Sequence, residues 1–528
     1  MILLWGSNAR ETHPIIFHHV LKGIHNGARL ITVDPRRTSS AQWADLWLGI
    51  DVGSDVSLAN GAAHVILEEG LENRDFIERA TTGFDDYARQ IAEYPLDRVE
   101  RETGVPAEAV RELARTYATA RRAQLCWTLG ITEHHNAVDN VLALINLALL
   151  TGHVGRYGSG LCPLRGQNNV QGGGDMGAIP NRLPGGQDVG LDHNRAKFET
   201  AWRVLAGRIP SAPGWHLTAM FEAMGRGELT HLYVIGENPA QSEADATHAN
   251  HLLEQLELLV VQDIFMTKTA ELADVVFPAS AAWAESEGTV TSSERRVQRV
   301  RKALDPPGNA RDDIWIISEL AARLGQDWGH PTPQQVWDEC RSLSPWHGGM
   351  SYSRLEELGG LPWPCPDEDH PGEPFLHARL WAENEADRGA PAPFHAVEHD
   401  PPVDELTDEF PLRLTTGRRL DSFNTGVQTG GYSSPLRRRE TLDLSPEDAE
   451  HYGLTEGEHV SISSRRGSVE APVRVDTTLR AGLAFMTLHF GDDVATNLLT
   501  IEATDPKSGT AEFKATAIRI DKLPVTAT

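Results

Sequence analysis

The fold is decided by the stretch Ile2-Leu-Leu-Trp-Gly-Ser-Asn8 and by the residues that follow it, up to Leu30-Ile-Thr-Val-Asp-Pro-Arg-Arg-Thr38. Its first apolar run stops at a Gly-Ser-Asn turn. Pro14 then opens a helical pattern that ends near Gly27, and a second apolar run begins at Leu30. This pattern predicts a βαβ unit, whose parallel sheet would bind ligands at the carboxyl ends of its strands.

The same arrangement recurs further along the chain. The stretches 231–239 and 258–263 are apolar runs that end in polar loops, and 274–278 is a third run. Gly236-Glu-Asn238 follows the first of these runs, as Gly6-Ser-Asn8 does near the N-terminus. We therefore predict an α/β protein with two doubly wound nucleotide-binding units that contain mixed sheets and bind two nucleotide moieties.

The pattern changes after residue 405. Residues 363–405 are rich in Pro and charged residues and suggest a linker or a surface excursion. Beyond them, short runs alternate at period two between glycine-containing turns, which predicts a small C-terminal β-barrel. Ser445-Pro-Glu-Asp448 looks like the start of a short helix. The predicted domains are 1–165 and 166–300 (α/β), 301–405 (connecting) and 406–528 (barrel).

Composition excludes several classes of function. The 528 residues carry a formal charge of −27, from 48 basic and 75 acidic residues. This charge disfavours nucleic acid or a membrane surface as the main partner. The four cysteines form no C-x-x-C pair, so we expect thiols in a reducing, cytoplasmic compartment rather than a disulfide framework, a zinc site or an iron–sulfur cluster. The longest apolar run, Val141–Leu150, is too short for a membrane span and predicts a buried helix.

The most informative stretch is Pro163-Leu-Arg-Gly-Gln-Asn-Asn-Val-Gln-Gly-Gly-Gly-Asp-Met-Gly-Ala178. Glycines and amide side chains dominate it without an apolar period, which predicts a loop that closely approaches a ligand. Arg165 is its one cation. A guanidinium matches a carboxylate with two parallel donors, so Arg165 could hold a small carboxylate substrate. The alternative is an arginine paired with Asp175 or another structural carboxylate.

This loop is similar, almost letter for letter, to the one shared by formate dehydrogenases of the molybdopterin oxidoreductase superfamily. The resemblance continues in family order over nearly the whole chain. It implies an enzyme that oxidises formate to carbon dioxide at molybdenum or tungsten held by two molybdopterin guanine dinucleotides. Arg165 would contact formate, Gln167 would act beside it, and Gly166 and Asn168 would line the pterins.

The resemblance also assigns cofactor contacts by position. One dinucleotide would be bound by Gly6, Asn8, Glu11, Asp34 and Arg36. The other would be bound by Gly236, Asn238, Gln262, Asp263 and Thr267. The C-terminal barrel, which would be of the double-psi type, would add Thr415, Gly417, Arg418, His489, Asn497 and Lys514. Ordinary turns, caps and surface cations remain the alternative for single residues such as Glu11 and Arg36.

Thr132-Glu-His-His-Asn136 precedes the predicted buried helix. Its paired histidines suggest a metal site, but adjacent side chains diverge in most backbones and no third ligand has a recognisable spacing. We therefore expect no metal ligands here and interpret the segment as a loop beside the pterin, with Asn136 or Asp139 as the helix N-cap. By the resemblance, Glu133 lines the active-site pocket and is a third candidate catalytic residue.

Full-length members of this family carry further residues upstream of the Gly-Ser-Asn motif. These are a cysteine set for a four-iron cluster and a metal-ligating cysteine or selenocysteine with a histidine beside it. The chain has no counterpart of them, so we expect a truncated chain. A selenocysteine codon read as a stop codon, a split gene or a plain truncation would each produce such a chain.

Two functions from different classes remain open at this stage. The first is formate oxidation, with an electron-transfer subunit or the missing N-terminal polypeptide as partner. The second is a non-catalytic pterin scaffold or one chain of a split enzyme, and a nitrate reductase is a weaker third. The sequence does not choose between molybdenum and tungsten, name the electron acceptor, or give the oligomeric state.

Overall fold

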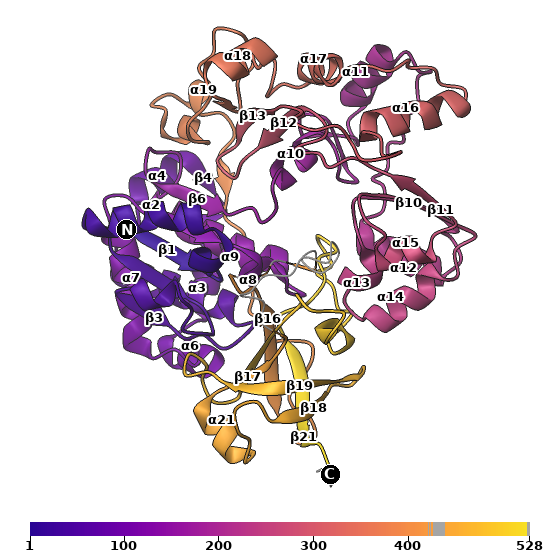
Figure 1. Cartoon of the computed structure of the whole chain (residues 1–528). Helices are drawn as coiled ribbons and strands as arrows, with labels where there is room; N and C mark the ends of the chain where they lie inside the picture. The colour runs from indigo at the N-terminus through magenta and orange to yellow at the C-terminus, as the bar shows by residue number, and fades with distance from the viewer. Residues whose placement is uncertain (421, 423, 426–438, 525–528) are drawn as a thin grey trace. The chain divides into compact units, whose positions relative to one another are not determined.

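The computed structural model describes residues 1–420, 422, 424–425 and 439–524 (Figure 1). The chain divides into two compact units. Unit 1 comprises Met1–Leu164, Gln241–Ala249 and Phe375–Thr528, and unit 2 comprises Arg165–Ala240 and Asn250–Pro374. The four predicted domain boundaries stay a prediction.

Unit 1 begins with the predicted βαβ element. Strand β1 (Ile2–Trp5) leads through helix α2 (Pro14–His25) to β2 (Leu30–Val33). The sheet has the order β3-β2-β1-β5-β6, and every neighbouring pair in it is parallel. The βαβ prediction is confirmed. The expectation of a mixed sheet is wrong here, because each connection brings the chain back to the end of the sheet at which the previous strand began.

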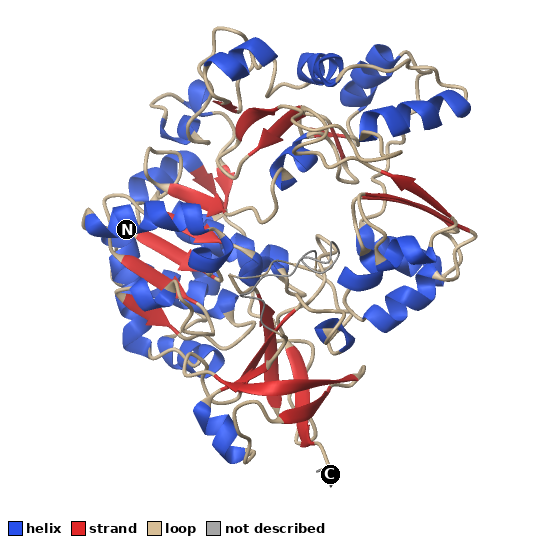
Figure 2. Cartoon of the chain, in the orientation of Figure 1, coloured by secondary structure: helices blue, strands red, loops and turns tan. Residues whose placement is uncertain are grey.

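Side chains of this sheet alternate between two cores. Leu3 and Trp5 of β1 belong to one core, which also includes residues of α3 and α9. Leu4, between them, belongs to a second core with Phe17 and Val20 of α2. A parallel sheet covered on both faces needs such continuous apolar strands. Figure 2 shows helices around these strands.

The remaining elements of this α/β part are short, apart from three longer helices. They are α1 (Ala9–Thr12), η1 (Ala41–Trp43), β3 (Leu46–Leu48), α3 (Asp55–Glu68), α4 (Arg74–Ala80), β4 (Thr81–Thr82), α5 (Phe84–Ile91), α6 (Leu96–Thr103), α7 (Ala107–Thr119), β5 (Gln124–Trp127), α8 (Leu129–Thr132), α9 (Ala137–Thr151) and β6 (Gly160–Pro163).

Helix α9 contains the predicted buried helix, and its N-cap is Asn136, as expected. The Asn136 side chain makes no capping hydrogen bond. It accepts one from Asn140 instead. Within the described residues, no helix is both long and apolar enough to cross a membrane.

The stretch 363–405 is poor in regular structure, as predicted, but its interpretation as a linker or surface excursion is only partly right. Its elements are η2 (Ala378–Trp381), α19 (Glu385–Arg388) and β15 (Ala392–Pro393), and β15 pairs with β4. Phe394 and Val397 are buried in the core of unit 1. Isolated apolar residues in a Pro-rich, acidic stretch give no periodic signal, although tertiary packing buries them.

The C-terminal part of unit 1 is a closed six-stranded barrel with the order β16-β20-β17-β19-β18-β21, which confirms the predicted barrel. The predicted helix start is also confirmed, because the Ser445 side chain accepts a hydrogen bond from Asp448 N at the beginning of α21. The elements are β16 (Leu412–Gly417), β17 (Leu442–Leu444), α21 (Pro446–His451), β18 (His459–Ser463), β19 (Ser468–Val475), β20 (Leu483–Thr487), η3 (Thr496–Leu498) and β21 (Thr516–Lys522).

Unit 2 contains a three-stranded parallel sheet, β11-β10-β9, so the expectation of a mixed sheet is wrong here as well. A second, antiparallel sheet has the order β12-β13-β14. The elements that begin between residues 165 and 374 are α10 (Val170–Asp175), β7 (Arg182–Leu183), β8 (Gln187–Asp188), α11 (Asp192–Trp202), α12 (Leu217–Gly225), β9 (His231–Ile235), α13 (Pro239–Ser242), α14 (Ala246–Leu253), β10 (Leu258–Asp263), α15 (Lys268–Leu272), β11 (Val275–Pro278), β12 (Gly288–Thr291), β13 (Arg296–Val300), α16 (Asp313–Arg323), α17 (Pro333–Leu343), α18 (Tyr352–Glu357) and β14 (Leu361–Pro362).

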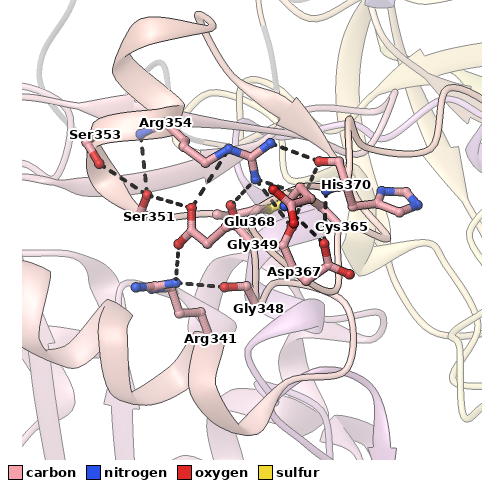
Figure 3. A network of polar contacts seen from close by, with 12 residues as sticks. Arg341, Gly348, Gly349, Ser351, Ser353, Arg354, Cys365, Asp367, Glu368 and His370 are labelled. Atoms are coloured by element: carbon pink, nitrogen blue, oxygen red, sulfur yellow. Dashed lines mark hydrogen bonds and ion pairs between the residues drawn. The ribbon is translucent and has the colours of Figure 1, made fainter.

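A polar network fixes residues 341–370 of unit 2 (Figure 3). Arg354 donates to the carbonyl oxygens of Gly349 and His370, and Arg341 donates to the carbonyl oxygen of Gly348 and to Glu368. The two guanidinium groups thus satisfy backbone acceptors of irregular chain, which would otherwise lose their hydration on folding. We interpret this network as structural.

Candidate functional site

The loop after β1 is held by the side chain of Asn8. Its Oδ1 accepts hydrogen bonds from Ser40 N (3.2 Å), Ser40 Oγ (2.9 Å) and Ser39 Oγ (3.1 Å). Glu11 Oε1, at 2.8 Å from Ser39 Oγ, is a second acceptor for the same hydroxyl hydrogen. Gly6 has a φ of 56°, and its N–H donates to Val33 O. The ends of β1 and β2 are therefore locked together by Asn8.

The loop after β9 in unit 2 repeats this arrangement. Asn238 Oδ1 accepts from Thr269 N (3.1 Å) and Thr269 Oγ1 (2.8 Å). Gly236 has a φ of 63°, and its N–H donates to Gln262 O. Thr267 caps α15 by accepting a hydrogen bond from Ala270 N. An asparagine two residues after a left-handed glycine again joins two neighbouring strand ends.

The two loops also match in spacing. Ser40 follows Asp34 by six residues, and Thr269 follows Asp263 by six. Each aspartate sits at a strand end and accepts a hydrogen bond from the backbone N–H two residues later. We call these two arrangements the asparagine clamps: Gly6, Asn8, Asp34 and Ser40 in unit 1, and Gly236, Asn238, Asp263 and Thr269 in unit 2. The correspondence predicted from Gly-Ser-Asn and Gly-Glu-Asn therefore extends to the partner loops.

The acidic groups at these strand ends are electrostatically perturbed. Burial raises the pKa of Asp34 to about 6, although the neighbouring Arg36 acts against the rise. In unit 2, Gln262 is fully buried and donates to Asp313 Oδ1 at 2.5 Å. Burial raises the pKa of Asp313 as well, although Gln262 stabilises its ionised form. A carboxyl group with a raised pKa therefore lies near the strand ends of each parallel sheet, Asp34 in unit 1 and Asp313 in unit 2.

Residues of the barrel meet residues of the N-terminal sheet within unit 1. Lys514 Nζ lies 2.6 Å from Glu133 Oε2 and donates to Thr416 O at 3.2 Å. The Arg36 guanidinium lies 3.6 Å from the centre of the Phe485 ring. Thr415 is paired with Phe485 between β16 and β20, and Gly417 lies beside Phe485 and Arg36. Predicted residues of the α/β part (Arg36, Glu133) and of the barrel (Thr415, Gly417, Lys514) therefore meet within unit 1.

Three other predicted barrel residues make structural contacts. His489 Nε2 accepts a hydrogen bond from Arg419 N at 3.1 Å. Asn497 Nδ2 donates to the carbonyl oxygens of Gln241 and Glu243. Arg418 Nε donates to Ser422 O, and burial lowers the pKa of this arginine. These contacts join the segments that follow β16 and β20 and hold η3 to residues 241 and 243.

The Arg165 loop is held to the β12–β13 hairpin, since Arg165 N donates to Ser293 Oγ at 3.1 Å. The side chains of Arg165, Gln167 and Asn168 are exposed, as is Gly166. Asp175 is buried and accepts hydrogen bonds from Gln171 and Trp363.

The prediction that this whole stretch is a loop is wrong at Val170–Asp175, which form helix α10. The Asn169 side chain, in a left-handed residue, accepts from Thr291 N of β12. Tertiary contacts of this kind override the low helix propensity of three consecutive glycines.

The adjacent histidines of the Glu133 segment behave differently from the expectation. Instead of diverging, His134 Nδ1 and His135 Nδ1 both approach Glu512 Oε2, at 3.3 and 3.4 Å. His135 Nε2 also lies 3.1 Å from Asp400 Oδ2. The backbone at 133–136 is irregular between α8 and α9, which lets neighbouring side chains point to one carboxylate. Within the described residues, no group of three or more His, Cys, Asp or Glu side chains could hold a metal ion.

Comparison with known proteins identifies the family. The family model for molybdopterin oxidoreductase matches residues 1–323, more than half of the chain, and that for the molydopterin dinucleotide binding domain matches 412–517. The chain belongs to the molybdopterin oxidoreductase family. The F420-dependent formate dehydrogenase 2 subunit alpha of Methanococcus maripaludis is 40% identical over 99% of this chain and 76% of its own length.

Two further comparisons bear on function and fold. The assimilatory nitrate reductase catalytic subunit of Bacillus subtilis is 33% identical over 98% of this chain and 74% of its own length. Acetylene hydratase from Pelobacter acetylenicus has a similar structure, with a TM-score of 0.72 at 21% identity, covering 99% of this chain and 78% of that one. This last likeness shows the fold alone.

Several residues beside the predicted cofactor contacts were not predicted from the sequence. They are Ser40, Thr269, Phe485 and Glu512, together with Ser7, which is buried, and Gly130, whose N–H donates to Gly6 O at 3.2 Å. Ser40 and Thr269 could have been found by aligning the two strand ends, because both lie six residues after an aspartate. Glu512 gave no signal, since its importance comes from contacts to residues 377 and 378 positions away.

Proposed function

We propose that this chain is the dinucleotide-binding body of a molybdenum- or tungsten-dependent formate dehydrogenase and that each asparagine clamp supports one pterin dinucleotide. The duplication of the clamps carries the proposal. A single Gly-x-Asn turn would be weak, but two copies that share a left-handed glycine, a strand-end aspartate and a clamped hydroxyl residue support two similar ligands. In the same proposal, both parallel sheets are doubly wound units and the barrel is of the double-psi type.

The chemistry of the residues present fits such a ligand. The Ser7 hydroxyl is buried and has no hydrogen-bond partner within the described part of the chain, which costs free energy unless a ligand supplies one. In unit 2, the consecutive apolar residues Ile264, Phe265 and Met266 beside Asp263 are 44–65% exposed. Three adjacent exposed apolar side chains offer a surface for a flat heterocycle.

The chain's own residues would supply binding and positioning. Asp34 and Asp263 would accept hydrogen bonds from a guanine or a ribose, and the N–H groups at the clamped turns would approach the pyrophosphate. Lys514 would bind a pterin or pyrophosphate oxygen, with Glu133 holding its ammonium group in place. The bound metal–pterin group would supply the two-electron redox chemistry.

Arg165 would bind the substrate. Its exposed guanidinium can form two parallel hydrogen bonds to formate, which fixes the orientation of the C–H bond that must be broken. The neighbouring Gln167 amide could donate a further hydrogen bond. Two observations favour formate oxidation over nitrate reduction. The sequence of this loop resembles that of formate dehydrogenases, and the identity to the archaeal formate dehydrogenase subunit (40%) is higher than that to the nitrate reductase subunit (33%).

The test is a dye-reduction assay on protein purified with its cofactor and metal content measured. We expect formate-dependent viologen reduction, and Arg165→Lys should lower kcat/KM for formate by about tenfold or more, because a lysine cannot make the bidentate contact. Arg182→Lys, which alters an arginine paired with Asp188 in the same unit, is the control. Oxidation of reduced viologen by nitrate but not by carbon dioxide would contradict the formate assignment. Cofactor content without either activity would favour the non-catalytic scaffold.

A further inference from the structure

Glu512 is the centre of a buried cluster in unit 1. Glu512 is fully buried, and its two carboxylate oxygens have separate sets of partners. Oε1 accepts from Lys514 N (2.7 Å) and Ala515 N (3.0 Å). Oε2 accepts from His135 N (3.0 Å) and faces the Nδ1 atoms of both histidines. One side chain therefore satisfies three backbone donors and two rings.

These partners belong to two segments far apart in sequence. Oε2 binds the segment between α8 and α9, and Oε1 binds the segment just before β21. A backbone hydrogen bond from Phe513 N to Glu133 O (3.1 Å) runs alongside. Glu133 and Lys514, whose side chains form the 2.6 Å ion pair, each lie within two residues of these contacts. The geometry of that pair is thus set from the Glu512 side.

Electrostatic interactions stabilise the cluster. Burial alone would lower the pKa of His134 and His135, but the Glu512 carboxylate outweighs it and raises both pKa values. The histidines in turn hold the pKa of Glu512 far below its usual range despite its burial. The Asp55 carboxylate also raises the pKa of His134, and that of Asp400 raises the pKa of His135. The Lys514 ammonium group, in contrast, lowers the pKa of His134. Removing one partner of such a buried set leaves uncompensated charge.

We infer that Glu512 is a positioning residue that holds Glu133 and Lys514 as a pair, so that the Lys514 ammonium group points to the cofactor's anionic oxygens. The part about the cofactor rests on the proposed function. The part about the pair does not, because it concerns only this chain. A carboxylate that merely stabilised the fold would have no selective effect on Lys514.

Glu512→Gln separates the two sides of the cluster. The Gln carbonyl oxygen can still accept from Lys514 N and Ala515 N, whereas its NH₂ group cannot accept from His135 N or from a histidine ring. The substitution therefore removes the Oε2 contacts to His134 and His135, while the contacts to Lys514 N and Ala515 N and the Phe513 N–Glu133 O bond remain. Asp404→Asn is the matched control: Asp404 is a buried carboxylate that binds Ala517 N, Arg465 and Arg466 and is not bonded to the 133–135 segment.

The first measurement needs no cofactor. Lysine acetylation followed by mass spectrometry reports the accessibility of each ammonium group in the apo protein. We expect Glu512→Gln to speed acetylation of Lys514 by about tenfold, as when one charge-assisted contact is lost, while Lys197 of unit 2 stays unchanged. Asp404→Asn should leave the rate at Lys514 unchanged. Equal acceleration at Lys514 and Lys197, or no acceleration at Lys514, would overturn the inference.

A second variant covers failure of Glu512→Gln to fold. His135→Asn removes one ring but keeps the backbone N–H, and it should give the same selective acceleration of about threefold, because part of the Oε2 contact set remains. Uniform acceleration in this variant would overturn the inference as well.

In cofactor-loaded protein, guanine nucleotide content after acid hydrolysis gives the second readout. We expect Glu512→Gln to lower it, and to have little further effect when Lys514→Gln is already present, because both changes disable the same contact. Selective labelling of Lys514 in the apo protein without any effect on nucleotide content would retain the pair and reject its role toward the cofactor. Full additivity with Lys514→Gln would also reject that role.

Discussion

Replacing Asn8 by alanine should open the loop that follows β2. Asn8 Oδ1 accepts hydrogen bonds from two donors of fully buried Ser40, its backbone N–H and its hydroxyl. Ser40 Oγ would keep only its bond from Arg10 N, in which it is the acceptor. Each buried donor that loses its partner costs about 1–3 kcal/mol, so Asn8→Ala should destabilise this loop by about 2–6 kcal/mol.

Hydrogen exchange measured by mass spectrometry tests this magnitude locally. A cost of about 3 kcal/mol corresponds to roughly a hundredfold faster exchange of the amides around Ser40, if exchange proceeds through local opening. Asn238→Ala is the reciprocal control, because it should accelerate exchange around Thr269 and leave Ser40 unchanged. Exchange around Ser40 within about threefold of the wild type in Asn8→Ala would refute the clamp, as would equal acceleration of both loops in either variant.

Three other predictions concern unit 1. Burial raises the pKa of Asp34 to about 6, so the folded state binds this proton more tightly than the unfolded state. The stability of the protein therefore falls as pH rises through that value. Asp34→Asn should raise the Tm of the apo protein at about pH 7.5 but not at about pH 4. Gly130→Ala would place a Cβ 2.5 Å from Gly6 O and should lower stability by about 1–3 kcal/mol in urea unfolding, whereas Gly160→Ala, with nothing within 4 Å, should have little effect. Asp443→Asn removes a fully buried carboxylate that pairs with two arginines and should cost about 3–5 kcal/mol in the same assay, so a loss below about 1 kcal/mol would contradict the role of that ion pair.

Much of the architecture could be predicted because it depends on local patterns. The runs Ile2–Trp5 and Leu30–Val33, with Pro14 between them, define a βαβ unit by periodicity and a helix start signal. The barrel strands were found in the same way, from alternation between glycine-containing turns. The error was the strand direction, since a run of apolar residues does not say whether its neighbour is parallel or antiparallel.

The site could be predicted only in part, for a different physical reason. The strand-end residues Asn8 and Asn238 lie next to their glycines and are visible in the sequence. The ion pair between Glu133 and Lys514 joins residues from opposite ends of the chain, so no spacing rule connects them. Helix α10 was missed because its stability comes from a contact to Thr291 and not from the propensity of its own residues.

The separation between His134 and Glu512 also has a consequence for synthesis. At roughly 5–20 residues per second, the 378 positions between them take about 20–75 s to translate. During that time unit 2 can be completed, since it ends at Pro374, whereas the histidine segment of unit 1 has not yet met its carboxylate. The barrel is therefore made after unit 2, and until Glu512 is synthesised the buried histidine segment lacks the carboxylate that accepts its backbone and ring hydrogen bonds.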